Sequence, residues 1–155
     1  MKLYTSYYGK QKALDKAGII PLAISVSIPD WATIDRDRCW YKALAPERSM
    51  MKMEWKEYVP KYRDILRAHN PVAVCNMIKK MSGGKDAALL CWEKDAEQCH
   101  RSLVAEWLNA KVGTHIEEWE VERADANQKT FFDPDEDGGM SGFIDRACDF
   151  IDGNK

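Results

Sequence analysis

The sequence predicts an α/β fold: a single domain with a largely parallel, Rossmann-like sheet flanked by helices. Short β-branched and aromatic runs alternate along the chain with amphipathic helical patterns, and most connectors between them are short. The run at residues 88–93 is apolar without alternation, which is typical of a strand buried on both faces of a parallel sheet. A chain of 155 residues is long enough to bury a core and is most simply one domain, spanning residues 1–155.

Five segments have the residues that strands favour. The first is aromatic and β-branched and ends in Gly9, the second is bounded by prolines, and the last roughly alternates apolar residues with acids. We expect the run at residues 88–93 to be the central strand. The predicted strands, in chain order, are residues 2–9, 21–29, 71–78, 88–93 and 114–122.

Four segments carry helical periodicity or helix end signals. Gly18 and Gly113 close two of them, as glycines commonly do at helix C-termini. The second helix is expected to begin near Pro60, because proline is tolerated in the first helical turn. Before it, residues 30–53 show no clean period, so we expect a long ordered loop with helical turns, and such loops are often functional. The predicted helices are residues 11–18, 55–70, 99–113 and 142–155.

Composition and charge exclude some classes of function. The chain is 45% hydrophobic and 31% charged with a net charge of −2, so no global attraction to nucleic acid or to an anionic membrane is expected, although a local basic patch is left open. No apolar run approaches the roughly 20 residues needed to span a bilayer. The N-terminal residues 1–10 lack the apolar core of a signal peptide. We expect a cytoplasmic protein with no membrane partner, and the sequence leaves its oligomeric state open.

The polar, acidic segment at residues 123–141 is predicted to be a solvated loop. The overlapping residues 133–144 resemble a calcium-binding loop, with Asp133, Asp135 and Asp137 at positions that supply oxygen ligands. The twelfth position of such a loop needs a bidentate glutamate, and this chain has isoleucine there. We therefore expect a solvated loop before the C-terminal helix rather than a calcium site.

The cysteines favour free thiols. Their number is odd, and irregular spacing in a cytosolic chain favours unpaired cysteines, of which a few have catalytic or metal-binding roles. Cys75 lies in an apolar run and Cys148 in the last helical pattern, so both are expected to be plain buried thiols. The five cysteines are Cys39, Cys75, Cys91, Cys99 and Cys148.

The turn after the predicted central strand is the default site, because ligands of parallel sheets bind outside the carboxyl ends of the strands. Cys91 and Glu93 stand at the end of that strand, on the same side by its period of two. Cys99, His100 and Arg101 begin the helix that follows. One strand–turn–helix unit therefore contains two thiols, a carboxylate, an imidazole and a guanidinium group.

These residue types are suited to nucleophilic or acid–base chemistry. A thiol at a helix N-terminus has its thiolate form favoured, and a neighbouring His or Arg strengthens the effect. The first backbone amides of the helix, together with Arg101, suit a phosphate or carboxylate group. Glu93 can orient Arg101, pair with His100 or act as a general acid or base. Cys91 or Cys99 would be the nucleophile or redox thiol.

Two other interpretations of the same residues stand beside this one. The cysteines can simply pack under the sheet while Glu93 and Arg101 tie the turn together, a purely structural role. Alternatively, Cys91, Cys99, His100 and Glu93 could supply four metal ligands, but the spacing matches none of the usual zinc patterns. Adjacent residues at a helix start also point about 100° apart. We therefore predict no metal and no cofactor.

The stretch LLCWEKDAEQCHRSLVAEWL, residues 89–108, resembles the signature of the bacterial and phage "domain of unknown function 488" family. That signature is an apolar strand ending in Leu-Cys-x-Glu, a short turn, and Cys-His-Arg opening a helix. YTSYYGK, PLAISVSIPDW, LAPERSM and EYVPKYRDIL are similar to other family segments in the same order. The similarity covers about residues 2–120 and is specific at residues 82–108.

The resemblance implies an α/β domain whose Cys-His-Arg turn lies at the ligand-facing edge of a parallel sheet. It names no reaction, although roles in nucleotide or nucleic-acid metabolism are suggested for the family. Carried over to this chain, it implies catalytic roles for Cys91, Glu93, Cys99 and His100, and substrate or anion binding by Arg101, Thr5, Ser6, Tyr7 and Trp31.

One departure from the family pattern concerns the second strand. Many family members have an arginine in this motif, where the chain reads SIPDW. If that arginine binds an anion in other members, this protein would bind it differently or with another residue, such as Arg36, Arg38 or Arg63.

The sequence thus predicts an enzyme or enzyme-like domain that acts on a nucleotide, a nucleic-acid base or another small anionic ligand at this turn. The alternative is a non-catalytic module that binds a nucleotide or nucleic acid in the same pocket. Aromatic residues near the strand ends can stack on a base or pack in the core, and both possibilities stay open. These residues are Tyr7, Tyr8, Trp31, Trp40 and Tyr41.

Overall fold

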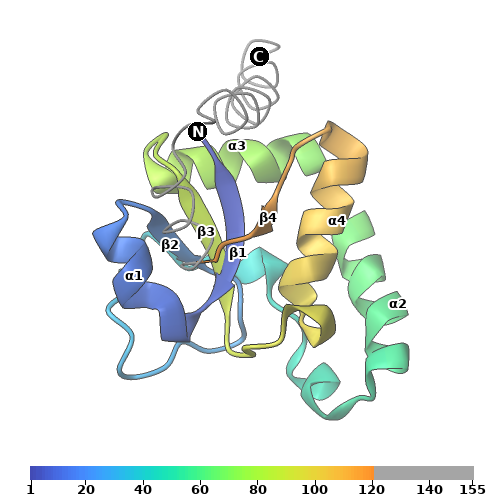
Figure 1. Ribbon diagram of the computed structural model, residues 1–155. Helices are drawn as coiled ribbons and strands as arrows, with labels where there is room; N and C mark the ends of the chain where they lie inside the picture. Colours follow the sequence, from blue (N-terminus) through green and yellow to red (C-terminus); the bar gives the residue numbers. More distant parts are fainter. Residues whose placement is uncertain (121–155) are drawn as a thin grey trace.

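The computed structural model describes residues 1–120, from the N-terminus to just beyond the last strand (Figure 1). The predicted acidic loop at residues 123–141, the calcium-like segment at residues 133–144, the helix at residues 142–155 and Cys148 all lie outside the described residues. Within the described part of the chain, no helix has the length and apolarity required to cross a membrane.

A sheet of parallel strands forms the centre of the described residues, which confirms the predicted α/β fold class. Its four strands are β1 (Leu3–Tyr7), β2 (Ile20–Ala23), β3 (Ala87–Cys91) and β4 (Glu117–Glu118), in the order β2-β3-β1-β4. All pairs are parallel. β3 lies between β2 and β1 and every residue of it is buried, which confirms the predicted central strand, although it ends at Cys91 and leaves Glu93 beyond it.

Helices cover both faces of the sheet (Figure 1). On one face α1 (Gln11–Lys16) packs through Leu14 against Leu90. The other face is covered by α2 (Trp55–Arg67), α3 (Pro71–Ser82) and α4 (His100–Val112). The core between these three helices and the sheet includes Leu66, Ile78, Val104 and Leu89.

The path of the chain creates a switch point between β1 and β3. The chain leaves β1 towards β2 and leaves β3 in the opposite direction towards β4. Because parallel crossovers are right-handed, connections in opposite directions place their helices on opposite faces of the sheet. The carboxyl ends of two such neighbouring strands open a crevice where α/β proteins bind ligands. Tyr7 and Cys91 are register partners at this end.

The predicted strand at residues 71–78 is wrong, because this segment is part of α3. Asn70 caps the helix by accepting hydrogen bonds from two backbone N–H groups, Pro71 opens it, and Gly83 ends it in the left-handed conformation with φ 65°. A short apolar run does not distinguish a strand from a buried helix segment. The residues that α3 buries recur at helical spacing: Val74, Cys75 and Ile78.

Several other boundaries also differ from the sequence-based expectation. β2 ends at Ala23, well before Pro29, because the chain then turns away from the sheet. Helix α2 begins at Trp55 rather than near Pro60, which lies inside it at the cost of one backbone hydrogen bond. The loop before it contains the expected helical turns, at Lys42–Leu44 and Arg48–Lys52.

Candidate functional site

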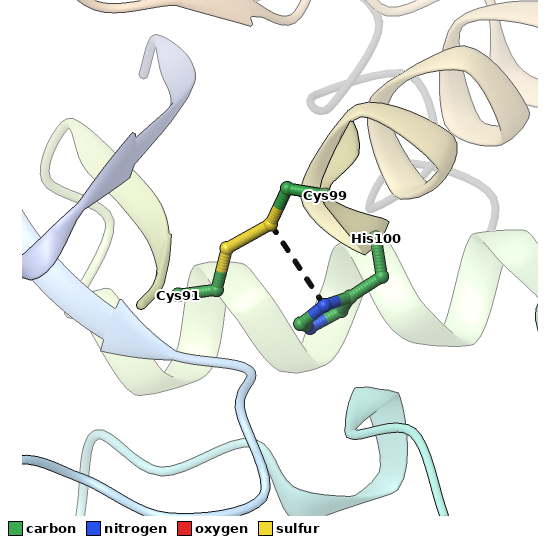
Figure 2. Close-up of side chains that lie close together, drawn as sticks. All are labelled: Cys91, Cys99 and His100. Carbon is green, nitrogen blue, oxygen red and sulfur yellow. Dashed lines mark hydrogen bonds between the residues drawn. A yellow bond between two sulfur atoms is a disulfide. The ribbon is translucent and has the colours of Figure 1, made fainter. Parts of the chain in front are cut away.

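The switch point brings together Cys91, the last residue of β3, and Cys99, the residue that precedes α4. Their sulfur atoms form a disulfide, and their Cα atoms lie 7.6 Å apart (Figure 2). Both residues are buried. The expectation of free thiols is therefore wrong for this pair, because the turn folds back and places the two sulfurs in contact. Cys39 and Cys75 are outside the disulfide.

His100 is buried beside the sulfurs and is held in one tautomer. Its Nε2 lies 2.7 Å from the carbonyl oxygen of Ile24, and since a carbonyl only accepts, Nε2 carries the hydrogen. Burial lowers the pKa of His100 to about 4; the Ile24 hydrogen bond opposes this shift and the Arg101 charge adds to it. At neutral pH the ring is therefore uncharged. Its Nδ1, 3.9 Å from Cys99 Sγ, carries a lone pair (Figure 2).

Arg101 is completely buried and makes five hydrogen bonds inside the protein. A guanidinium group has five N–H donors, so every donor of Arg101 has a protein acceptor. The Glu118 carboxylate accepts two of these bonds at 3.0 and 2.9 Å, and Cys91 Sγ accepts one at 3.1 Å. The remaining two acceptors are the carbonyl oxygens of Glu93 and Lys94. Anion binding by Arg101 stays a prediction, and it would require displacement of Glu118.

Glu93 lies on the solvent side of the site. Its side chain is exposed, and its Oε2 lies 3.3 Å from Cys99 Sγ. A cavity of about 150 Å³ opens beside this pair. Besides Glu93, the cavity is lined by Cys99, His100, Gln98, Met50, Met51, Met53, Trp55 and Tyr58. The site therefore combines a sulfur atom, a carboxylate and an uncharged imidazole with methionine and aromatic side chains on one wall.

A family model with the description "Active DUF488-N3 subclade" matches residues 23–112, more than half of the chain. The chain belongs to this DUF488 family. The match spans β3, the turn and all of α4, and it confirms the family resemblance seen in the sequence. Comparisons with curated proteins and with solved structures found no match.

In this DUF488 domain, two of the predicted residues on β1 contact Arg101 or its partner Glu118. Thr5 Oγ1 donates to Glu118 at 2.7 Å, and the Tyr7 ring lies with its centre 5.8 Å from the Arg101 guanidinium carbon. Ser6, between them, faces the opposite side of the sheet by strand alternation. Its buried hydroxyl has no hydrogen-bond partner among the described residues.

The remaining predicted residues lie apart from the cavity lining. Trp31 stands in the loop after β2 and is 63% exposed. Arg36 donates to the carbonyl of Pro29, and Arg63 pairs with Glu106 on the exposed surface of the helices. None of these residues lines the cavity at Cys99.

Sequence reasoning missed two parts of the site. Glu118 holds Arg101 from a strand that follows it in the chain, and the only available signal was the acidic pair EE in the predicted last strand. The wall of methionine and aromatic side chains comes from the loop before α2 and the start of α2. Its signal was the methionine-rich run SMMKM followed by Trp55.

Proposed function

We propose that this DUF488 protein is a thiol-dependent enzyme in which Cys91 and Cys99 alternate between a dithiol and a disulfide. The observation that carries the proposal is the pairing of their sulfurs at the switch point of the sheet, with a carboxylate and an uncharged imidazole beside them. The substrate is a small molecule, or a protruding group, that reaches the cavity at Cys99.

The two sulfurs have different roles because their surroundings differ. Cys99 lines the cavity, so its sulfur is the one that meets the substrate. Cys91 is completely buried behind it and acts as the resolving thiol. The N-terminus of α4 favours the thiolate of Cys99, and the hydrogen bond from Arg101 favours the thiolate of Cys91.

The reaction is thiol–disulfide exchange, written here for a disulfide substrate. The Cys99 thiolate attacks one substrate sulfur, which forms a mixed disulfide and expels the other substrate sulfur as a thiolate. The Cys91 thiolate then attacks Cys99 Sγ, which forms the Cys91–Cys99 disulfide and expels the second substrate thiolate. The substrate gains two electrons and, after protonation, becomes two thiols, while the protein loses the same two electrons.

Glu93 and His100 assist through protons and hydrogen bonds. The Glu93 carboxylate is exposed and lies 3.3 Å from Cys99 Sγ, so it is the group that passes the proton lost by the Cys99 thiol to water. Because the pKa of His100 is about 4, its Nδ1 is a hydrogen-bond acceptor at neutral pH. It accepts the S–H of reduced Cys99 and orients that sulfur.

The cavity limits the size of the substrate. Its volume of about 150 Å³ is below the range of about 300–1,000 Å³ that is typical of pockets for larger ligands. A larger disulfide substrate would insert only its disulfide group and keep its remaining groups outside. Met50, Met53 and Trp55 form one wall of the cavity, which the polar groups of Glu93 and His100 also line.

Trapping of the mixed disulfide tests the proposal. The reduced Cys91→Ser variant should react with a small aromatic disulfide and accumulate one mixed disulfide at Cys99, because the resolving thiol is missing. Reduced wild-type protein should instead release two thiols per chain and form the Cys91–Cys99 disulfide. Absorbance of the released thiol and peptide mass spectrometry provide the measurements.

Cys39 is the internal control for this experiment. Burial, together with the charge of Asp35, raises the pKa of Cys39, so this thiol should react slowly at neutral pH. A Cys39→Ser variant should behave as the wild type. If Cys99 reacts no faster than Cys39, or if the mixed disulfide forms elsewhere, the thiol enzyme proposal fails. A cavity ligand that binds without any thiol exchange would instead favour the binding module.

A further inference from the structure

Cys91, Cys99 and His100 place three metal-ligand atoms at one buried point. Their two Sγ atoms and a ring nitrogen of His100 all lie within 4.8 Å of one another, and all three residues are buried (Figure 2). Thiolate and imidazole are the ligands that zinc prefers, and a Cys₂His set with one open position is a known form of catalytic zinc site. We propose that the reduced protein binds one Zn²⁺ ion through Cys91 Sγ, Cys99 Sγ and His100 Nδ1.

The spacing of the ligand atoms is close to what a tetrahedral zinc site needs. Zinc bonds of about 2.3 Å to sulfur and about 2.0–2.1 Å to nitrogen put a sulfur and a nitrogen about 3.6 Å apart. The distance from Cys99 Sγ to His100 Nδ1 is 3.9 Å. Two zinc-bound sulfurs would lie about 3.8 Å apart, and reduction of the disulfide frees them to separate.

The groups around the three ligands also fit a metal site. A zinc-binding histidine almost always donates its other ring N–H to a carbonyl or carboxylate, and His100 Nε2 donates to the Ile24 carbonyl. This bond leaves Nδ1 as the ligand atom. Arg101 donates to Cys91 Sγ and offsets part of the negative charge that two thiolates bring. The fourth position faces the cavity, where the Glu93 carboxylate lies 3.3 Å from Cys99 Sγ.

One step of the sequence argument against a metal site is wrong, and it concerns the backbone conformation of Cys99. It assumed that Cys99 and His100 are both helical, so that their side chains diverge. Cys99 instead has extended backbone angles of φ −135° and ψ 141° and only precedes the helix. Its side chain therefore converges with that of His100, and the two sit 3.9 Å apart at their ligand atoms.

Zinc and the disulfide exclude each other, which makes the site sensitive to redox state. A dithiol reductant supplies the two electrons and two protons that convert the disulfide to two thiols, and is itself oxidised to a disulfide. Binding of Zn²⁺ then displaces any proton still on the two sulfurs, because the ligands are thiolates. Oxidation of the thiolates by a disulfide compound releases the ion. The zinc site shares its side chains with the proposed enzyme but does not depend on that activity.

Titration of the whole chain with metal tests the inference. Protein reduced with a phosphine and desalted under nitrogen should bind one Zn²⁺ and release at most two protons at neutral pH, one for each thiol that is protonated before the ion binds. Co²⁺ should give the thiolate-to-cobalt absorption and the intense visible bands of a tetrahedral site, and Zn²⁺ should abolish both. The oxidised protein should show neither signal.

Matched serine variants locate the ion. Cys91→Ser and Cys99→Ser should each lower Zn²⁺ affinity by at least about 100-fold, since changes to outer groups alone cost about 10–100-fold. Cys75→Ser, at a buried cysteine of α3, should bind as the wild type does. Circular dichroism verifies that each variant is folded.

Two results would overturn the zinc site. One is a reduced wild-type protein that binds Zn²⁺ no better than the Cys91→Ser, Cys99→Ser double variant, and the other is a Co²⁺ complex without thiolate absorption. The enzyme proposal is tested separately, because disulfide exchange is measured on metal-free protein. If disulfide exchange fails but the Co²⁺ spectra are as expected, the enzyme proposal is wrong and the metal site stands. If exchange occurs but the Co²⁺ spectra lack thiolate absorption, the metal site is wrong and the enzyme proposal stands.

Discussion

Arg101 shows how one residue ties the site together. It lies on the first turn of α4, and its guanidinium joins the turn after β3 to Glu118 on β4. The same group donates to Cys91 Sγ. Sequence reasoning predicted that Arg101 binds an anionic ligand. In the structure all its donors instead bond to the protein, and its positive charge acts on Cys91 Sγ.

Replacement of Arg101 should cost much of the stability of the domain. We expect Arg101→Gln to lower the free energy of unfolding by about 3–5 kcal/mol, the usual cost of breaking a buried ion pair, because Glu118 and two carbonyls lose their donors. Urea denaturation of the oxidised protein measures it.

Arg63→Gln is the control for this change. Arg63 pairs with Glu106 on the surface, where an ion pair contributes no more than about 1 kcal/mol. Equal losses in the two variants would contradict the structural role of Arg101.

The limits of sequence reasoning are clearest at this residue scale. Cys91, Glu93, Cys99 and His100 could be placed at one turn because the strand and helix that carry them are adjacent in sequence. Two features of the site could not be predicted from the sequence. The partner of Arg101 comes from a strand 17 residues later, and the convergence of Cys99 with His100 depends on one extended backbone position.

At the scale of elements, α3 shows how end signals outrank composition. Its apolar residues favoured a strand, although Asn-Pro before them and Gly-Gly after them are the start and stop signals of a helix. Packing then decides the outcome, since Val74 and Ile78 share the face that meets the core. By contrast, the helix at α4 was predictable because periodicity, Cys-His-Arg and Gly113 all indicated the same element.

The cap of α3 can be tested directly. Asn70→Ala removes the side-chain oxygen that accepts hydrogen bonds from the N–H groups of Val72 and Ala73, at 2.9 and 3.3 Å. Loss of such a cap costs about 1 kcal/mol, so thermal and urea unfolding should show a decrease of that size. Asn76→Ala, in the interior of the same helix, should change stability by less than about 0.5 kcal/mol. The helix assignment would be undermined if Asn76 mattered more than Asn70.

At the scale of the whole molecule, the sheet topology determines where the chemistry lies. Opposite crossovers from β1 and β3 open the switch point, and both the disulfide and the cavity lie beside it. The fold class and the edge of the sheet were predictable because they follow from the order of the elements. The wall of methionine and aromatic side chains was not, since it depends on how the loop containing Met50 and Met53 packs against α4 over a long sequence separation.

The core on the α1 face of the sheet has a buried titratable residue of its own, Tyr8. It is buried, and its hydroxyl forms a hydrogen bond with Ser25 in the loop after β2. Burial raises the pKa of Tyr8 from 10.0 to about 12; the Ser25 hydrogen bond and the Arg36 charge oppose the shift, and Glu93 adds to it. Because the unfolded chain loses this proton near pH 10, it binds fewer protons than the folded protein between pH 10 and 12.

Alkaline pH should therefore destabilise the wild type through Tyr8. The stabilising effect of the buried phenol is complete below pH 10 and is lost as the pH rises to 12. At about 1.4 kcal/mol for each pKa unit, the loss is at most about 3 kcal/mol. Urea unfolding at pH 8, 10 and 11 should show a smaller decrease for Tyr8→Phe, which has no phenol to ionise and is about 1 kcal/mol less stable at pH 8 through loss of one hydrogen bond. Any disulfide exchange at high pH affects both proteins alike, so the difference between them isolates Tyr8. Parallel pH curves for the two proteins would show that ionisation of Tyr8 does not limit the stability of the domain.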